Sequence, residues 1–217
     1  MDNLRFSERL QQGCRTLGVS VGEEVPPKLH RLMNELIKWN AKVNLTAITE
    51  PEEVLEKHFL DSLAVLPEVE GAGSLLDLGA GAGFPGLPLK LARPALAVTL
   101  VDAVGKKVGF LKASIAALGM KEARGLHARA EGQPEKEGIA RAELLIARAF
   151  MDLPDWLNLA PAYVLPGGRV VAMLGKAQPE PELRARADER GLSFVSARQY
   201  RLPFSGAERQ VAVFGKG

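Results

Sequence analysis

The chain has 217 residues, of which 47% are hydrophobic and 25% charged, and its formal net charge is +2. This composition is typical of a globular protein and excludes a disordered chain, and without a dense basic tail any RNA binding must come from a folded surface. The sequence contains no apolar run of about 18 residues, so no membrane-spanning segment is expected. It also shows neither a signal-peptide core nor a metal-binding motif, which predicts a cytoplasmic, metal-free protein.

Residues 1–70 are predicted to be helical. Apolar residues at positions 29, 32, 33, 36 and 37 follow the pattern of an amphipathic helix, and Pro26-Pro27 suits its start. A second stripe predicts another helix between Pro51, near its first turn, and Pro67, after its end. Cys14, the only cysteine, is expected to fill apolar space on an N-terminal helix. A short linker, 71–73, then separates this helical extension from a domain over 71–217.

From Ser74 onward, short apolar runs alternate with helical stretches. The runs predicted to be strands are 74–78, 97–102, 124–128, 143–147, 169–174, 192–198 and 210–214. Between the second and third run, an apolar stripe over 108–118 predicts a helix that ends at Gly119. Strands that alternate with helices indicate an α/β fold with a parallel, doubly wound sheet. The last two runs have no helix between them and are predicted to form an antiparallel pair.

The most informative segment follows the first predicted strand, where glycines stand at positions 79, 81, 83 and 86. Glycine suits a tight turn with φ > 0 and lets a ligand approach the backbone. Asp102 ends the second strand, 21 positions after Gly81, as in the dinucleotide-binding fingerprint. A pyrophosphate would be opposed by Asp77, the carboxylate at the end of the first strand. The cationic groups of S-adenosylmethionine (SAM) suit that carboxylate better.

The pattern Asp77-x-Gly79-x-Gly81-x-Gly83, followed by Asp102, resembles motif I and the ribose-binding acid of class I SAM-dependent methyltransferases. Further strings resemble the bacterial ribosomal RNA small subunit methyltransferase G family, also called glucose-inhibited division protein B. These strings are Trp39-Asn40-x-x-Val43-Asn44-Leu45-Thr46-Ala47-Ile48, His58-Phe59-Leu60-Asp61-Ser62-Leu63, Phe84-Pro85-Gly86-Leu87-Pro88-Leu89, Val101-Asp102-Ala103, Lys106-Lys107-Val108, Phe110-Leu111, Arg129-Ala130-Glu131 and Ala147-Arg148-Ala149-Phe150. The resemblance implies a Rossmann-like, seven-stranded sheet and transfer of a methyl group from SAM to N7 of a guanine in 16S rRNA. The substrate would be that RNA or the 30S particle.

The resemblance also implies a set of SAM-binding residues. They are Asp77, Gly79, Gly81, Gly83, Phe84, Asp102, Ala130, Glu131 and Arg148. Within this set, the glycines would bring backbone amides to the methionine end of SAM, with Phe84 beside the cofactor. Asp102 would accept hydrogen bonds from the ribose hydroxyls, and the amide of Ala130 or Glu131 would contact the adenine edge.

Guanine N7 already carries an exposed lone pair, so its methylation needs positioning and electrostatics rather than a general base. Arg148, at the carboxyl end of the fourth strand, is the candidate catalytic residue and would hold the SAM carboxylate or the guanine. Arg129 is a candidate contact for RNA phosphate. Where the family usually has a lysine-glycine pair, this chain has Leu174-Gly175, and Lys176 is the candidate RNA-binding substitute.

Four residues ahead of the sheet are expected at the edge of the cofactor pocket: Asn44, His58, Asp61 and Ser62. The last three share a helix face, but the chain has no nucleophile elbow, so a packing cluster is favoured over a hydrolase triad. Trp39 and Trp156 are expected in the core. The residues leave three other functions open: a SAM-dependent methyltransferase for a small molecule, a SAM-fold protein that binds RNA without catalysis, and an NAD-linked oxidoreductase.

Overall fold

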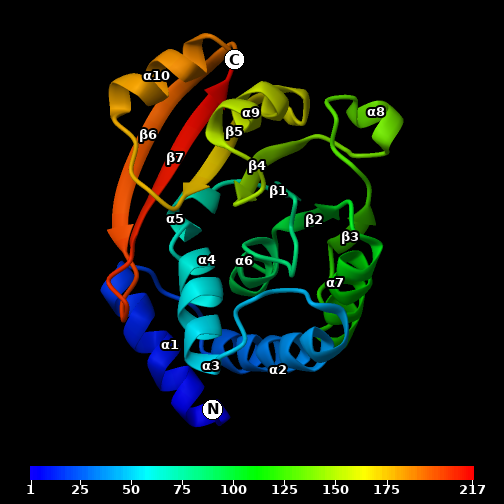
Figure 1. Cartoon of the computed structure of the whole chain (residues 1–217), viewed down its shortest axis with the longest axis vertical. Coiled ribbons are helices and arrows are strands. Elements are labelled where there is room, and N and C mark those ends of the chain that lie inside the picture. The colour runs from blue at the N-terminus through cyan, green and yellow to red at the C-terminus, as the bar shows by residue number, and fades with distance from the viewer.

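The computed structural model describes all residues from 1 to 217. Its seven strands form one sheet in the order β3-β2-β1-β4-β5-β7-β6 (Figure 1). The strands are β1 Ser74–Leu78, β2 Ala97–Asp102, β3 Ala123–His127, β4 Ala142–Arg148, β5 Val164–Leu174, β6 Leu192–Arg201 and β7 Glu208–Lys216. Strands β1 to β5 pair in parallel, and β7 is antiparallel to both of its neighbours. The predicted doubly wound sheet and its antiparallel closing pair are confirmed.

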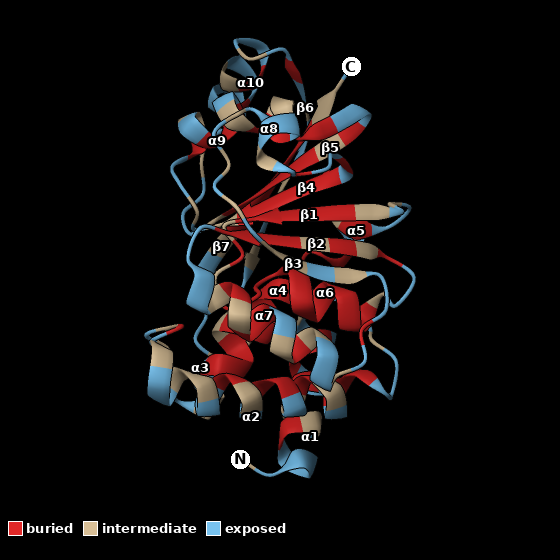
Figure 2. Cartoon of the chain, turned by 90° about the vertical axis from the view of Figure 1, so that its right-hand side faces the viewer, coloured by how far each residue is buried: buried red, intermediate tan, exposed pale blue.

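Helices cover both faces of the sheet, so the molecule has three layers (Figure 2). One face carries α1 Asn3–Leu17, α2 Val25–Val43, α3 Pro51–Val54, the π-helical turn Leu55–Leu60, α4 Asp61–Leu63, α5 Leu66–Val69, α6 Gly86–Ala92 and α7 Gly105–Ala117. The other face carries α8 Pro134–Glu137, α9 Leu153–Leu159, the 3₁₀ turn Ala160–Ala162 and α10 Glu180–Asp188. Leu75 of β1 points into the first layer of core and Leu76 into the second. Burial on both faces explains why the central strands are continuous apolar runs.

The helices of residues 1–70 pack directly against the sheet and share a buried cluster with it. Three phenylalanines connect them to the glycine loop: Phe6 of α1 lies 5.8 Å from Phe59, ring centre to ring centre, and Phe59 lies 5.5 Å from Phe84. Cys14 is buried in the same cluster, as predicted. None of the helices combines the length and apolar composition that a membrane crossing requires.

The segment after Pro51 differs from the predicted uninterrupted helix. Residues 55–60 form a π-helical turn, and the helical run ends at Leu63. Pro67 does not follow the end of this helix but lies in the first turn of the separate helix α5, where a missing backbone N–H costs nothing. The π-helical turn places the Glu56 carboxylate against the β6–β7 turn, where it accepts hydrogen bonds from the amides of Phe204 (2.6 Å) and Ser205 (2.7 Å). This departure from the helical period is therefore tied to a tertiary contact.

Candidate active site

The glycine loop begins at the carboxyl end of β1, and two carboxylates brace it from within. Gly79, Gly81 and Gly83 all have positive φ, as the predicted tight turn requires. The amide of Gly81 donates to Asp102 Oδ2 (2.9 Å), and the amide of Gly86, at the start of α6, donates to Asp77 Oδ2 (2.8 Å). The loop conformation is thus fixed by the two acids that end β1 and β2.

A cavity of about 470 Å³ opens beside this loop, and we call it the Asp102 pocket. It is lined by Gly79, Val101, Asp102, Ala103, Lys107, Ala128, Arg129, Ala130, Glu131, Ala149, Phe150 and Met151. The structure therefore brings together predicted residues from the ends of β1, β2 and β3. Phe150 covers Gly79 so closely that a Cβ there would lie 2.1 Å from the phenyl ring. Phe150 was not predicted as a lining residue, although it lies in the Ala-Arg-Ala-Phe string.

Other predicted residues shape the loop from behind, outside the walls of the Asp102 pocket. Asp77 has no exposed surface, and Oδ1 has no hydrogen-bond partner. Burial raises the pKa of Asp77 to about 7, and this residue lines neither the Asp102 pocket nor any cavity beside it. Phe84 is 4% exposed and stacks on His58 at 4.3 Å instead of facing the cavity. Gly83 is packed against Leu87, where a Cβ would clash.

The structure also narrows the choice between the two predicted backbone amides after β3. The amide of Glu131 donates to Glu137 Oε1 (2.9 Å) and is not available to a ligand. The amide of Ala130 makes no hydrogen bond within the protein. Asp102 uses both carboxylate oxygens, accepting from Gly81 and from the amide of Val104 (2.8 Å), yet each oxygen keeps a further lone pair.

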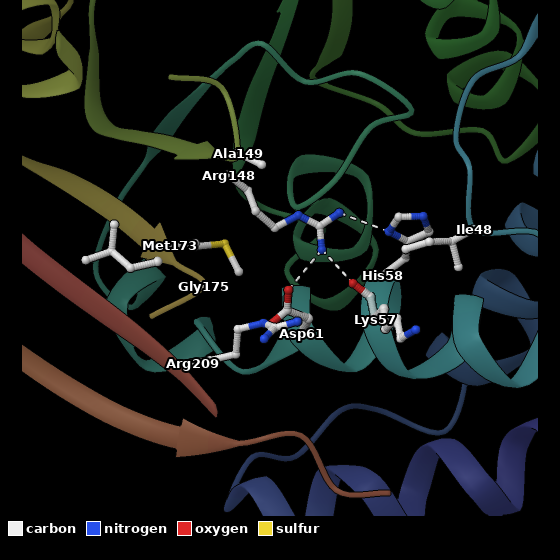
Figure 3. A pocket seen from close by; sticks show the side chains of 10 residues that line it. Ile48, Lys57, His58, Asp61, Arg148, Ala149, Met173, Gly175 and Arg209 are labelled. Carbon is white, nitrogen blue, oxygen red and sulfur yellow. Dashed lines mark hydrogen bonds and ion pairs between the residues drawn. The ribbon is translucent and has the colours of Figure 1, made fainter. Parts of the chain in front are cut away.

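Figure 3 shows a second cavity of about 370 Å³, which we call the Arg148 pocket. It is lined by Ile48, Lys57, His58, Asp61, Arg148, Ala149, Met173, Leu174, Gly175 and Arg209. Ala149 lines both cavities and has φ +51, an unusual value for a residue with a side chain. Lys176, the predicted RNA contact, is exposed just beyond the Leu174-Gly175 wall.

Arg148 is held by three acceptors from the helical run after Pro51. It donates to the Lys57 carbonyl (2.7 Å), to Asp61 Oδ2 (3.0 Å) and to His58 Nδ1 (3.0 Å). His58 must therefore be the tautomer that accepts at Nδ1 and donates from Nε2 to Thr46 Oγ1 (3.1 Å). Burial, with the Arg148 charge, lowers the pKa of His58 to about 3, which keeps the ring neutral. Three of the five N–H groups of Arg148 are engaged, which leaves Nε–H and one N–H of Nη2 for a ligand.

The predicted cluster around His58 is larger than the sequence indicated. His58 and Asp61 are joined through Arg148, whereas the Ser62 hydroxyl donates back to the His58 carbonyl. Asp61 also accepts from Tyr200 Oη (2.7 Å) and lies 3.6 Å from Arg209 Nε. Sequence reasoning missed Tyr200 and Arg209, because no local pattern relates the β6–β7 hairpin to a helix so far upstream. Asn44 lies at a neighbouring hollow with Ile48.

Comparison with known proteins places this chain in a family. The family model described as rRNA small subunit methyltransferase G matches residues 26–212. A relative from Myxococcus xanthus, named ribosomal RNA small subunit methyltransferase G, is 77% identical and covers 100% of both chains. This chain belongs to the rRNA small subunit methyltransferase G family. Relatives with the same name from Anaeromyxobacter dehalogenans and Geobacter sulfurreducens are 45% and 41% identical, covering 95% and 98% of this chain and 96% and 99% of theirs.

Solved structures agree on the fold of this rRNA small subunit methyltransferase G family member. A SAM-dependent methyltransferase from Aquifex aeolicus has a TM-score of 0.57 at 17% identity, covering 80% of this chain and 97% of its own. TrmN from Thermus thermophilus has a TM-score of 0.56 at 23% identity, covering 75% and 53%. Family and fold together identify the chain as a methyltransferase with SAM as its cofactor.

The residues present fit this cofactor. The Asp102 pocket offers a carboxylate with lone pairs to spare and an unpaired backbone amide at Ala130, and Gly79 lies on its wall. The carboxylate and the amide are the groups that ribose hydroxyls and an adenine acceptor require. No set of three or more His, Cys, Asp or Glu side chains gathers in an arrangement suited to a metal ion.

Proposed function

We propose that this enzyme transfers a methyl group from SAM to N7 of a guanine in 16S rRNA, as free RNA or within the 30S particle. One observation carries the proposal: the Asp102 pocket and the Arg148 pocket adjoin at Ala149. A methyl transfer needs donor and acceptor in adjacent compartments, and this pair of cavities provides them.

Within the Asp102 pocket, Asp102 would bind the ribose hydroxyls, Ala130 the adenine edge and Gly79 the methionine end of SAM. SAM supplies an electrophilic methyl group on a sulfonium. Gly81, Gly83, Phe84 and Asp77 would act through the loop, by holding its backbone in place. Glu131 would form part of the pocket wall without donating its amide to SAM, because that amide already donates to Glu137.

The Arg148 pocket has the features expected of a site that needs no general base. His58 is neutral and already accepts a hydrogen bond from Arg148, and both oxygens of Asp61 are engaged. What the pocket offers instead is the pair of unused N–H groups on Arg148, which suit the O6 atom of a guanine or the carboxylate of SAM. We assign Arg148 to the guanine, with N7 left free to react, and the experiment below separates the two assignments.

The target guanine must be unpaired or splayed out, because N7 lies in the deep, narrow groove of an A-form helix. Three basic residues that form no ion pairs lie around the two cavities: the half-buried Lys107 and the exposed Arg129 and Lys176. We propose Arg129 and Lys176 as phosphate contacts. Lys176 would do so from beside the pocket, since Leu174 occupies the wall where the family usually has lysine.

The first test is chemical cleavage of 16S rRNA. N7-methylguanosine is cationic with a labile glycosidic bond, so borohydride and aniline should cut the rRNA at one site in wild-type cells. Cells that lack the gene should lose this cut, and the wild-type gene should restore it. An unaltered cut in the deletion strain would exclude this guanine as the target.

The second test is Arg148→Ala, which should lower methylation by roughly 10- to 100-fold because charged hydrogen bonds to the bound groups are lost. Binding of S-adenosylhomocysteine by the variant should be retained if Arg148 contacts guanine and lost if it contacts the SAM carboxylate. Arg184→Ala is the matched control, since Arg184 pairs with Glu180 on α10 and lies over the Phe194 ring, and it lines neither cavity. Full methylation by Arg148→Ala would contradict a catalytic role.

A further inference from the structure

The wall of the Asp102 pocket after β3 is fixed by a network that lies outside the pocket. Three consecutive amides of this loop point away from the cavity, toward two side chains. The amides of Glu131 and Gln133 donate to Glu137 Oε1, both at 2.9 Å. The amide of Gly132 donates to Tyr163 Oη (2.7 Å), and Tyr163 Oη in turn donates to Glu137 Oε2. All three backbone N–H donors of this turn are thus used on one carboxylate and one hydroxyl.

The two side chains come from different parts of the second helical layer. Glu137 is the last residue of the short helix α8, and Tyr163 precedes β5 and is fully buried. Consecutive amides that converge on an anion form the same concave arrangement that proteins use to bind phosphate, here filled by a carboxylate of the chain itself. Gly132 has φ +92, which allows the three amides to turn to the same side.

The consequence appears one residue earlier in the chain. Residues 131–133 are anchored from behind, whereas the amides of Arg129 and Ala130, just before them, make no hydrogen bond within the protein. Ala130 is the free donor that directly adjoins the anchored turn. We propose that Glu137 and Tyr163 are positioning residues that make the enzyme selective for adenine, by holding the Ala130 amide toward the N1 acceptor of the SAM base. The inference rests on the proposed binding of SAM in the Asp102 pocket.

The Glu137–Tyr163 pair, which anchors the turn 131–133, keeps its protonation state around neutral pH. Although burial opposes its ionisation, the hydrogen bonds from Tyr163, Gln133 and Glu131 lower the pKa of Glu137. Burial and the adjacent Glu137 raise the pKa of Tyr163 to about 12. Carboxylate and phenol therefore keep the protonation states that the network needs, and the anchor is not a pH switch.

The test uses two nucleoside probes: S-adenosylhomocysteine, whose N1 is an acceptor, and its deaminated inosine analogue, whose N1 carries a proton. Isothermal titration of the unmodified enzyme should show strong preference for the adenine form. Tyr163→Phe should weaken S-adenosylhomocysteine binding about tenfold and reduce the preference by a similar factor. Glu137→Gln keeps one neutral acceptor, so its losses of S-adenosylhomocysteine affinity and of the preference for adenine should be smaller. At saturating SAM, kcat should be unchanged, because the Arg148 pocket is untouched.

Glu135→Ala is the matched control, because Glu135 lies on the same helix and pairs only with Arg141. An unchanged preference in Tyr163→Phe and Glu137→Gln would overturn the proposal, as would equal losses in Glu135→Ala. A general loss of folding would weaken both probes equally, and the ratio of the two dissociation constants would then stay constant and count against the proposal. Failure of the unmodified enzyme to bind S-adenosylhomocysteine would contradict the proposed function itself, and this measurement comes first.

Discussion

Among the buried acids, Asp77 is the one with no exposed surface, and its protonation is linked to folding. Desolvation is the largest cause of its raised pKa of about 7, against an ordinary value of 3.8. Between these pH values the native state holds a proton that the unfolded chain has released. The stability that this proton contributes is therefore lost as pH rises from about 4 to 7, at up to about 1.4 kcal/mol per pH unit.

We predict that Asp77→Asn, which cannot titrate but can still accept from Gly86, flattens this dependence. Denaturant unfolding from pH 4 to 8 should show the native enzyme losing stability relative to the variant as pH rises. Asp188→Asn, an exposed site at the end of α10, should follow the native curve. Parallel curves for the native enzyme and Asp77→Asn would show that Asp77 has an ordinary pKa.

At the scale of elements, the π-helical turn and the β6–β7 hairpin act as one unit. Glu56 on the turn is 5% exposed and accepts from two hairpin amides, and Asp61 at the end of the turn accepts from Tyr200 of β6. A regular α-helix would change the direction of every side chain after the turn. The hairpin thus helps to place the groups that hold Arg148.

We predict that Glu56→Ala lowers the free energy of unfolding by roughly 2–4 kcal/mol, because two charged hydrogen bonds are lost and two amides are left without a partner. Hydrogen exchange at the Phe204 and Ser205 amides should speed up. Glu53→Ala, which removes an exposed pair with Lys57, should change stability by less than about 1 kcal/mol. Equal stability of the two variants would mean that the hairpin does not depend on Glu56.

At the scale of the whole molecule, residues 1–70 and the sheet share one buried cluster, so we predict that they unfold together. The two tryptophans report on opposite layers: Trp39 packs with Phe110 at 5.9 Å in the first, and Trp156 is buried in the second. Fluorescence of Trp39→Phe and Trp156→Phe should give denaturation curves of the same shape, each coincident with circular dichroism of that variant. An earlier transition seen only through Trp39 would instead establish 1–70 as a separately folding domain.

The sequence by itself determined the order of strands and helices, the glycine turn and the acids at the ends of β1 and β2. These features follow from local requirements: burial on both faces makes strands apolar, and positive φ selects glycine. The family strings around Asp102, Ala130 and Arg148 likewise predicted that the cofactor is SAM and that the enzyme is a methyltransferase. Tertiary structure alone decided which of these groups line the two cavities and which are buried or already hydrogen-bonded. Asp77 and Phe84 turned out to be buried, Glu131 to be engaged by Glu137, and Arg148 to be held by the helical run.

The physical reason is that availability depends on partners from remote segments. Tyr200 lies 139 residues from Asp61 in the sequence, yet its hydroxyl donates directly to the Asp61 carboxylate. Tyr163 lies 31 residues from Gly132, yet its hydroxyl accepts directly from the Gly132 amide. No periodicity or spacing encodes such pairs, because they arise where the insertion of β7 between β5 and β6 and the packing of α8 bring those segments together. Local sequence determines where each candidate site residue lies along its strand or loop. Long-range packing determines which of its hydrogen-bonding groups remain without a partner inside the protein.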